Sequence, residues 1–197
     1  MWYYVKQSFL SFMYLIFMAM ISLAILMIEL PWLRILLNLL NLGLYLSIVC
    51  AASFKDGETA LRIRVANDVE RREIIRTGEN RPLKLKEEYK PWKGFVFGLI
   101  ACVPLVALLL VHTVLVNFID PNLNGAGIAS SLIYATFYTF ASSIFGGFAT
   151  WHYYFTLIAI PIISFATGIP YIMGGKRIER QQNVIKEKQR QIYGDKI

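Results

Sequence analysis

The chain has 197 residues, 56% of them hydrophobic and 17% charged, and its formal net charge at pH 7 is +7. A soluble domain is usually about 45–50% apolar and does not contain several apolar runs of about 20 residues. This composition argues against an ordinary soluble domain and indicates an integral membrane protein. We expect no nucleic-acid partner, because the positive charges flank apolar segments, as they do in membrane proteins.

The positive charges are concentrated in two segments. Residues 55–93 hold 11 of the 20 Lys and Arg residues together with 8 acidic residues, and residues 176–197 hold 7 Lys and Arg with 3 acidic residues. Short loops rich in Lys and Arg stay on the cytoplasmic side of a membrane. We therefore predict that both segments are cytoplasmic, the first as a loop and the second as the tail.

Four apolar runs are predicted transmembrane helices. Residues 9–28 and 33–54 form a hairpin that reverses before Pro31, because proline disfavours helix at the residue preceding it. Residues 94–118 and 151–173 are the other two spans. The chain then divides into an N-terminal transmembrane hairpin (1–54), a basic cytoplasmic loop with an amphipathic helix (55–93), a C-terminal transmembrane region (94–175) and a basic cytoplasmic tail (176–197).

A fifth apolar segment, residues 128–148, conflicts with the charge pattern. If it also crossed, the basic tail would lie outside and a turn without any positive charge would lie inside. We therefore predict an all-α polytopic protein of a bacterial-type cell membrane, with both termini cytoplasmic. It has four full transmembrane helices and a re-entrant or interfacial helix over 128–148. Five transmembrane helices are the alternative.

Small side chains recur at every fourth position of this segment, namely at Ser131, Ala135, Thr139, Ser143 and Gly147. Small residues on one face allow helices to approach closely in lipid. Gly94 and Gly98 repeat this spacing at the start of the third predicted span. We predict that both sets pack against other helices. In the alternative, Thr139 and Ser143 face a water-filled cavity.

Few polar or ionisable side chains accompany the predicted spans, and an ionisable group inside a bilayer is a candidate for function. With four crossings, the outer half contains His112, Asn117, Asp120 and His152. Together with Thr139 and Ser143, these residues are candidates for a substrate or ion pathway. The two histidines lack the spacing of a known metal motif, so we predict no metal site and no cofactor.

Residues 58–77 are predicted to form a helix that ends at Gly78, a typical helix stop. This helix carries Arg62, Arg64, Arg71, Arg72 and Arg76. A basic helix attracts the anionic lipids of the inner leaflet and acidic protein partners alike. These arginines therefore predict contact with the membrane surface or docking of a partner.

The sequence contains no Walker loop, Rossmann glycine motif, GxSxG, CxxC or HExxH pattern. We predict a non-enzymatic accessory, scaffold or regulatory subunit of a membrane assembly, which packs against another membrane protein or a second copy of itself. A small solute or ion transporter or channel that uses the outer polar residues is the alternative, and a membrane enzyme comes third.

Overall fold

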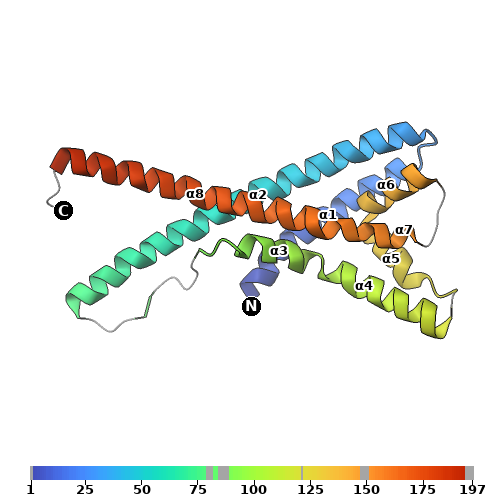
Figure 1. Ribbon diagram of the computed structural model, residues 1–197, viewed down its shortest axis with the longest axis horizontal. Coiled ribbons are helices and arrows are strands. Elements are labelled where there is room, and N and C mark those ends of the chain that lie inside the picture. Colours follow the sequence, from blue (N-terminus) through green and yellow to red (C-terminus); the bar gives the residue numbers. More distant parts are fainter. Residues whose placement is uncertain (1, 79–81, 84–88, 121, 147–150, 194–197) are drawn as a thin grey trace.

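The structure is a computed structural model that describes residues 2–78, 82–83, 89–120, 122–146 and 151–193. All regular structure in these ranges is helical, which confirms the all-α prediction (Figure 1). The elements are α1 (Trp2–Leu26), α2 (Pro31–Thr77), α3 (Lys93–Ala101), α4 (Val103–Val114), the π-helical η1 (Leu115–Ile119), α5 (Gly125–Ile133), α6 (Ala135–Phe145), α7 (His152–Phe155), the 3-10 turn η2 (Thr156–Ile158) and α8 (Ala159–Tyr193).

Several of these helices are long and apolar enough to span a membrane. Three unbroken stretches qualify by length and composition: Ser8–Leu26, Pro31–Thr77 and His152–Ile192. Two pairs of shorter helices qualify only when each bent pair is taken together, which gives up to five candidate spans. The first of these pairs is α3 with α4 and η1, and the second is α5 with α6.

The first two helices form the predicted hairpin, and Pro31 is the first residue of α2. Proline suits this position because its missing N–H has no partner within the first turn of a helix. We call the end of the molecule where α1 meets α2 the hairpin end. The opposite end, where α2 and α8 finish, is the tail end (Figure 1).

Helix α2 continues without a break for 47 residues. Residues 58–77 are helical as predicted, but they continue α2 and do not begin a separate helix. Neither proline nor an αL glycine interrupts residues 55–58, and Gly57 keeps helical geometry while it lies against α8. At about 1.5 Å per residue the helix is about 70 Å long, more than twice the thickness of a bilayer core. It ends at Gly78, which adopts φ +70° as predicted for a helix stop.

The third predicted span is a broken helix. The axes of α3 and α4 meet at an angle of 41° around Cys102. Pro104 lies in the first turn of α4 and supplies no backbone donor, which explains why the chain bends there. At the hairpin end, α4 continues into the short π-helical η1, which ends before the turn at Asp120.

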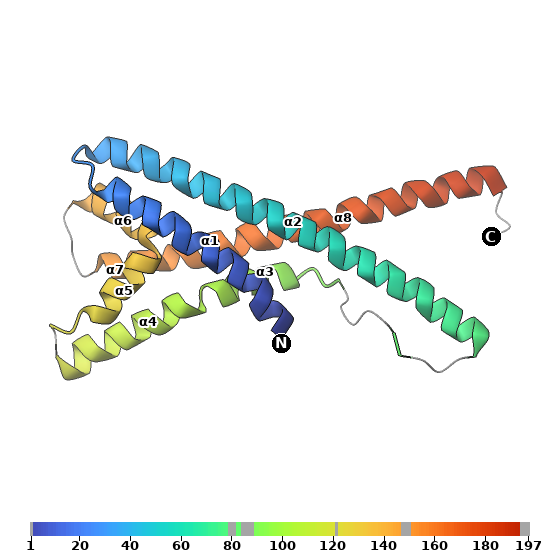
Figure 2. The same cartoon turned by 180° about the vertical axis from the view of Figure 1, so that it is seen from behind.

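The segment predicted as one helix over 128–148 is two helices with a bend of 103° at Tyr134. The pair starts at the hairpin end, runs inward beside α1 and returns to the same end (Figures 1 and 2). The face of small residues is therefore not continuous, because Ser131 lies on α5 whereas Ala135, Thr139 and Ser143 lie on α6. Gly147 lies outside the described residues.

Helices α2 and α8 cross near their middles and then diverge toward the tail end (Figures 1 and 2). Glycine permits the crossing on both helices. A Cβ at Gly57 would collide with the carbonyl oxygen of Tyr171, and a Cβ at Gly174 would collide with that of Phe54. We call the two diverging segments, residues 58–77 of α2 and 176–193 of α8, the fork.

Candidate functional site

A buried network of polar side chains joins α1, α2 and α6. The Ser22 hydroxyl donates to Asn38 Oδ1 over 2.8 Å and lies 2.9 Å from the hydroxyl of Thr136. The Asn38 amide donates to the backbone carbonyl of Thr136 over 2.6 Å. Ser22, Asn38 and Thr136 are each at most 1% exposed. Three helices are thus joined by hydrogen bonds where the surroundings are apolar.

Asn41 extends this network by one turn of α2. Its Nδ2 donates to the carbonyl of Met18 over 2.9 Å and to the Ser22 hydroxyl over 2.8 Å. Sequence reasoning missed the network altogether. Asn38 and Asn41 are two amides three positions apart in an apolar span, and that spacing, which places them on one helix face, was the available signal.

The bends of the two broken helix pairs meet at Tyr134. This residue is fully buried, and its hydroxyl donates to the carbonyl of Ala101 over 3.0 Å. Tyr45 and Cys102 belong to the same buried core as Tyr134. The Tyr45 hydroxyl has no hydrogen-bond partner. Backbone groups released by irregular helix in an apolar region need such side-chain partners.

A second cluster at the hairpin end contains both histidines of the chain. His112 of α4 packs edge-on against Tyr153 with ring centroids 5.2 Å apart, and Tyr153 stacks on Tyr138 of α6 at 5.8 Å. His152 lies 6.2 Å from Tyr138 and 4.2 Å from Trp151. We call His112, Tyr138, His152 and Tyr153 the histidine–tyrosine cluster.

Glycine makes room for this cluster, since a Cβ at Gly127 of α5 would lie 2.9 Å from His112 and against the Tyr153 ring. Both histidines are at most 2% exposed. The Nδ1 atom of His112 has no hydrogen-bond partner. The cluster therefore joins α4, α5, α6 and α7 through packed rings.

The other residues predicted for a pathway do not meet at one point. Asn117 is exposed, and the Asp120 carboxylate accepts a hydrogen bond of 2.9 Å from the N–H of Asn122, as in an ordinary Asx turn. Thr139 is buried, and its hydroxyl donates to the Ala135 carbonyl of its own helix over 2.7 Å. Ser143 is 9% exposed, and its hydroxyl has no partner.

The chemistry that these residues allow is limited. Within the described residues, no three His, Cys, Asp or Glu side chains come close enough to hold a metal ion. Among the described residues, the buried amides and hydroxyls bond mainly to backbone carbonyls and, in the network of Ser22, Asn38, Asn41 and Thr136, to one another. Such an arrangement fixes helices in one packing.

Gly94 and Gly98 lie on the face of α3 that contacts α8. A Cβ at Gly94 would meet the Tyr171 side chain and Gly168, and a Cβ at Gly98 would meet Thr167 and the backbone of Ser164. The two glycines therefore lie where α3 and α8 approach each other most closely. The matching small residues on α8 were not part of the sequence prediction.

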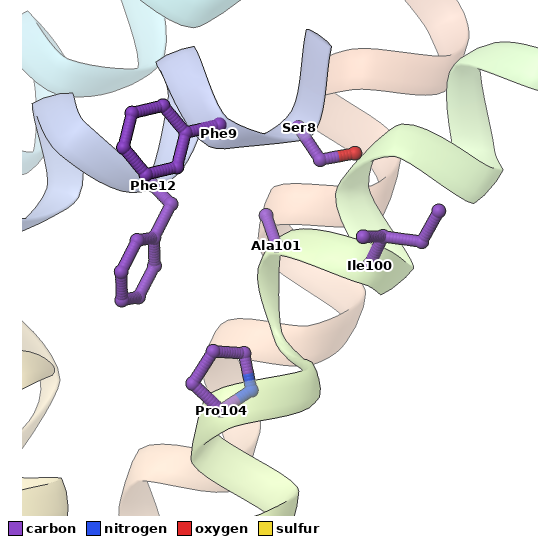
Figure 3. A pocket seen from close by; sticks show the side chains of 6 residues that line it. All are labelled: Ser8, Phe9, Phe12, Ile100, Ala101 and Pro104. Carbon is purple, nitrogen blue, oxygen red and sulfur yellow. The ribbon is translucent and has the colours of Figure 1, made fainter. Parts of the chain in front are cut away.

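A groove opens between α1 and the bend of the third span (Figure 3). It has a volume of about 210 Å³ and is lined by Ser8, Phe9, Phe12, Ile100, Ala101 and Pro104. Five of these six side chains are apolar. Ala101 lines the groove, and its carbonyl accepts the hydrogen bond from the Tyr134 hydroxyl.

The arginines predicted for docking are all exposed and lie along the α2 arm of the fork: Arg62, Arg64, Arg71, Arg72 and Arg76. Arg71 forms an exposed ion pair with Asp68 at 3.6 Å. Large apolar side chains accompany them, since Val69 is 63% exposed and Ile75 is 81% exposed. On the α8 arm Val184, Ile185 and Ile192 are exposed as well. The fork thus presents cationic and apolar groups together.

Comparison with known proteins assigns no family to this chain: no family model matches it, and neither a curated protein sequence nor a solved structure matches it significantly.

Proposed function

We propose that the chain is a non-enzymatic scaffold or accessory subunit of a membrane assembly, and that the fork is its docking element. The observation that carries this proposal is the combination of continuous helix and exposed apolar side chains at the tail end. Ile75 and Ile192, at opposite arms of the fork, are 81% and 71% exposed. Several large apolar side chains exposed together on a surface that faces water mark an interaction site.

The proposed topology has four crossings of the cell membrane, with both termini in the cytoplasm. Helices α1, α2, α3–α4 and α7–α8 cross, whereas α5–α6 is a re-entrant pair. The bend of 103° at Tyr134 supports this count. So does the return of α5–α6 to the hairpin end (Figure 2). The positive charge of the fork supports a cytoplasmic position.

This topology distinguishes the two roles predicted for the arginines. Arg71 lies 17 residues beyond Phe54, or about 25 Å along a continuous helix, and the Debye length at physiological ionic strength is about 8 Å. The far arginines are therefore beyond the reach of inner-leaflet lipid charge, and a protein partner with acidic and apolar groups suits them better. Arg62 and Arg64 lie close enough to the bilayer to contact anionic lipid.

The experiment is site-specific photo-crosslinking in cells that express the full chain. We expect a photo-reactive amino acid at Val69 or Ile185 to give one discrete crosslinked species, either a second copy or one other subunit. Ile185→Asp should then abolish both the crosslink from Val69 and co-purification of that subunit. Asn183→Asp is the matched control, because it adds the same charge two positions away on another face of α8.

Two outcomes would contradict the scaffold proposal. One is that Ile185→Asp and Asn183→Asp leave co-purification equally intact. The other is that the photo-reactive group at Val69 and at Ile185 gives no crosslink to another chain, while the purified protein has the mass of a single chain. Either result would mean that the fork has no stable partner.

A small transporter or channel is a second candidate, which the re-entrant pair favours. Non-helical backbone at membrane depth commonly lines a substrate path in transporters. The polar groups around this bend are Ser22, Asn38 and Thr136, and they already bond to one another. The test is solute or ion flux in liposomes. Loss of flux in a folded His112→Ala or Asp120→Ala variant would favour this second function over the scaffold.

A further inference from the structure

A groove lies between α2 and α8 close to the crossing, at the level where α8 changes from apolar to charged residues. Its volume is about 350 Å³. It is lined by Phe54 from α2 and by Met173, Lys176, Arg177, Arg180 and Gln181 from α8. The groove therefore has two kinds of wall, one apolar and one cationic.

The cationic wall is formed by residues that are neighbours on the surface of one helix. Lys176 and Arg180 are one turn apart, so their side chains lie on the same face of α8. Neither of them makes an ion pair with any described residue. The acid on the same turn, Glu179, forms no ion pair with either of them, and Tyr89 packs against α8 at Gly175. Two positive charges thus face the groove without a counter-ion among the residues that the structure describes.

Arg177 has a different role, because it is held in place by α2. Its guanidinium donates to Glu58 over 3.0 Å and lies 5.9 Å from the centroid of the Phe54 ring. The Glu58 side chain is only 18% exposed. This contact joins the two helices at the edge of the groove and gives the cationic wall a fixed position.

The apolar wall of the groove begins one turn of α8 before these charges, at Met173. Met173 is 56% exposed although it belongs to the apolar part of α8, and Phe54 faces it from α2. Along the groove, apolar side chains are therefore followed by two cations, Lys176 and Arg180, that have no ion-pair partner among the described residues. A phospholipid presents its acyl chains and its phosphate in this same order at a membrane interface.

We propose that this groove binds the phosphate-containing headgroup of one anionic phospholipid. Lys176 and Arg180 contact the phosphate, and the first part of an acyl chain lies along Phe54 and Met173. The inference rests on the proposed membrane position of α8, but it does not require the scaffold function. A lipid bound here would set the depth of the α2–α8 crossing in the bilayer and so the direction of the fork.

The test uses the full chain purified in a neutral detergent. Native mass spectrometry would count lipids bound after addition of phosphatidylglycerol or, in a parallel sample, phosphatidylcholine. We expect one phosphatidylglycerol to stay bound under conditions that remove phosphatidylcholine. The double variant Lys176→Gln/Arg180→Gln should bind phosphatidylglycerol at least fivefold more weakly. Arg177 is left unchanged because its ion pair with Glu58 joins α8 to α2.

The matched control is Lys186→Gln/Arg190→Gln, which removes the same two residue types at the same spacing farther along α8. This variant should bind phosphatidylglycerol as the unchanged protein does. Equal weakening in both double variants would overturn the proposal, because it would mean that diffuse charge attracts the lipid. Equal retention of the two lipids would also overturn it, as would complete competition by inorganic phosphate at millimolar concentration. Circular dichroism establishes that each variant is folded.

Discussion

Tyr134 donates a hydrogen bond of 3.0 Å to the carbonyl oxygen of Ala101, and this contact joins the bends of two broken helix pairs. In an unbroken α-helix the N–H of Leu105 would pair with the carbonyl of Ala101. The tyrosine hydroxyl therefore donates to the carbonyl that Leu105 would use in an unbroken helix, at the place where Pro104 disturbs the helix.

Removal of this hydroxyl should weaken the fold. For Tyr134→Phe we expect the free energy of unfolding to fall by about 1–2 kcal/mol, because a buried carbonyl loses its partner. Titration with a denaturing detergent, followed by tryptophan fluorescence, measures this change. Tyr154→Phe is the control, since its hydroxyl bonds Thr113 at an exposed position. Equal losses in the two variants would show that the bend has no special dependence on Tyr134.

The polar network offers a test of coupling between helices. Asn38→Ala and Ser22→Ala should each destabilise the protein by about 1 kcal/mol, and the double variant should lose less than the sum of the two. The same detergent titration gives all four free energies of the cycle. Ser47→Ala is the control, because this hydroxyl is exposed and bonds only the Gly43 carbonyl of its own helix. Strict additivity of Asn38→Ala and Ser22→Ala would mean that the network does not couple α1 to α2.

The sequence predicted the helical class, the hairpin turn before Pro31 and the helix stop at Gly78 because each depends on local chemistry. Proline and glycine act on the backbone where they stand, so their effects can be read without tertiary structure. The bend at Tyr134 was missed because it has no such local cause. Its stabilising partner, the Ala101 carbonyl, lies 33 residues earlier in the chain.

The candidate site was predicted only in part for the same reason. His112 and His152 were recognised as unusual in apolar segments, but the tyrosines that separate them could not be placed from sequence. Gly57 and Gly174 were not recognised because a single glycine acquires meaning only when the opposing helix is known. Periodicity of four residues in 128–148 misled the prediction, since it assumed one uninterrupted helix.

The number of crossings can be measured by chemical labelling. We would place single cysteines at Asn124, Thr150 or Gln191 in a protein that lacks Cys50 and Cys102, and treat intact cells with an impermeant maleimide. Four crossings predict labelling at positions 124 and 150 but not at 191. Labelling at 124 and 191 but not at 150 would mean five crossings. That result would remove the re-entrant pair and, with it, the reason to consider transport.

The α2–α8 crossing makes the sharpest prediction about stability. A methyl group at position 174 would collide with the backbone carbonyl of Phe54, and backbone cannot move aside unless the two helices separate. We therefore expect Gly174→Ala to lower the free energy of unfolding by about 1–3 kcal/mol. The detergent titration described above measures this loss.

Gly43→Ala is the matched control for the crossing, because this glycine lies on α2 with nothing within 4 Å of an added Cβ. That substitution should raise stability by about 0.5–1 kcal/mol, since alanine is the better helix former. If the free energy of unfolding falls for Gly174→Ala and rises for Gly43→Ala, the effect of close helix approach is distinguished from that of helix propensity. If Gly174→Ala proved as stable as Gly43→Ala, then α2 and α8 would not touch through their backbones, and the fork would have no fixed angle.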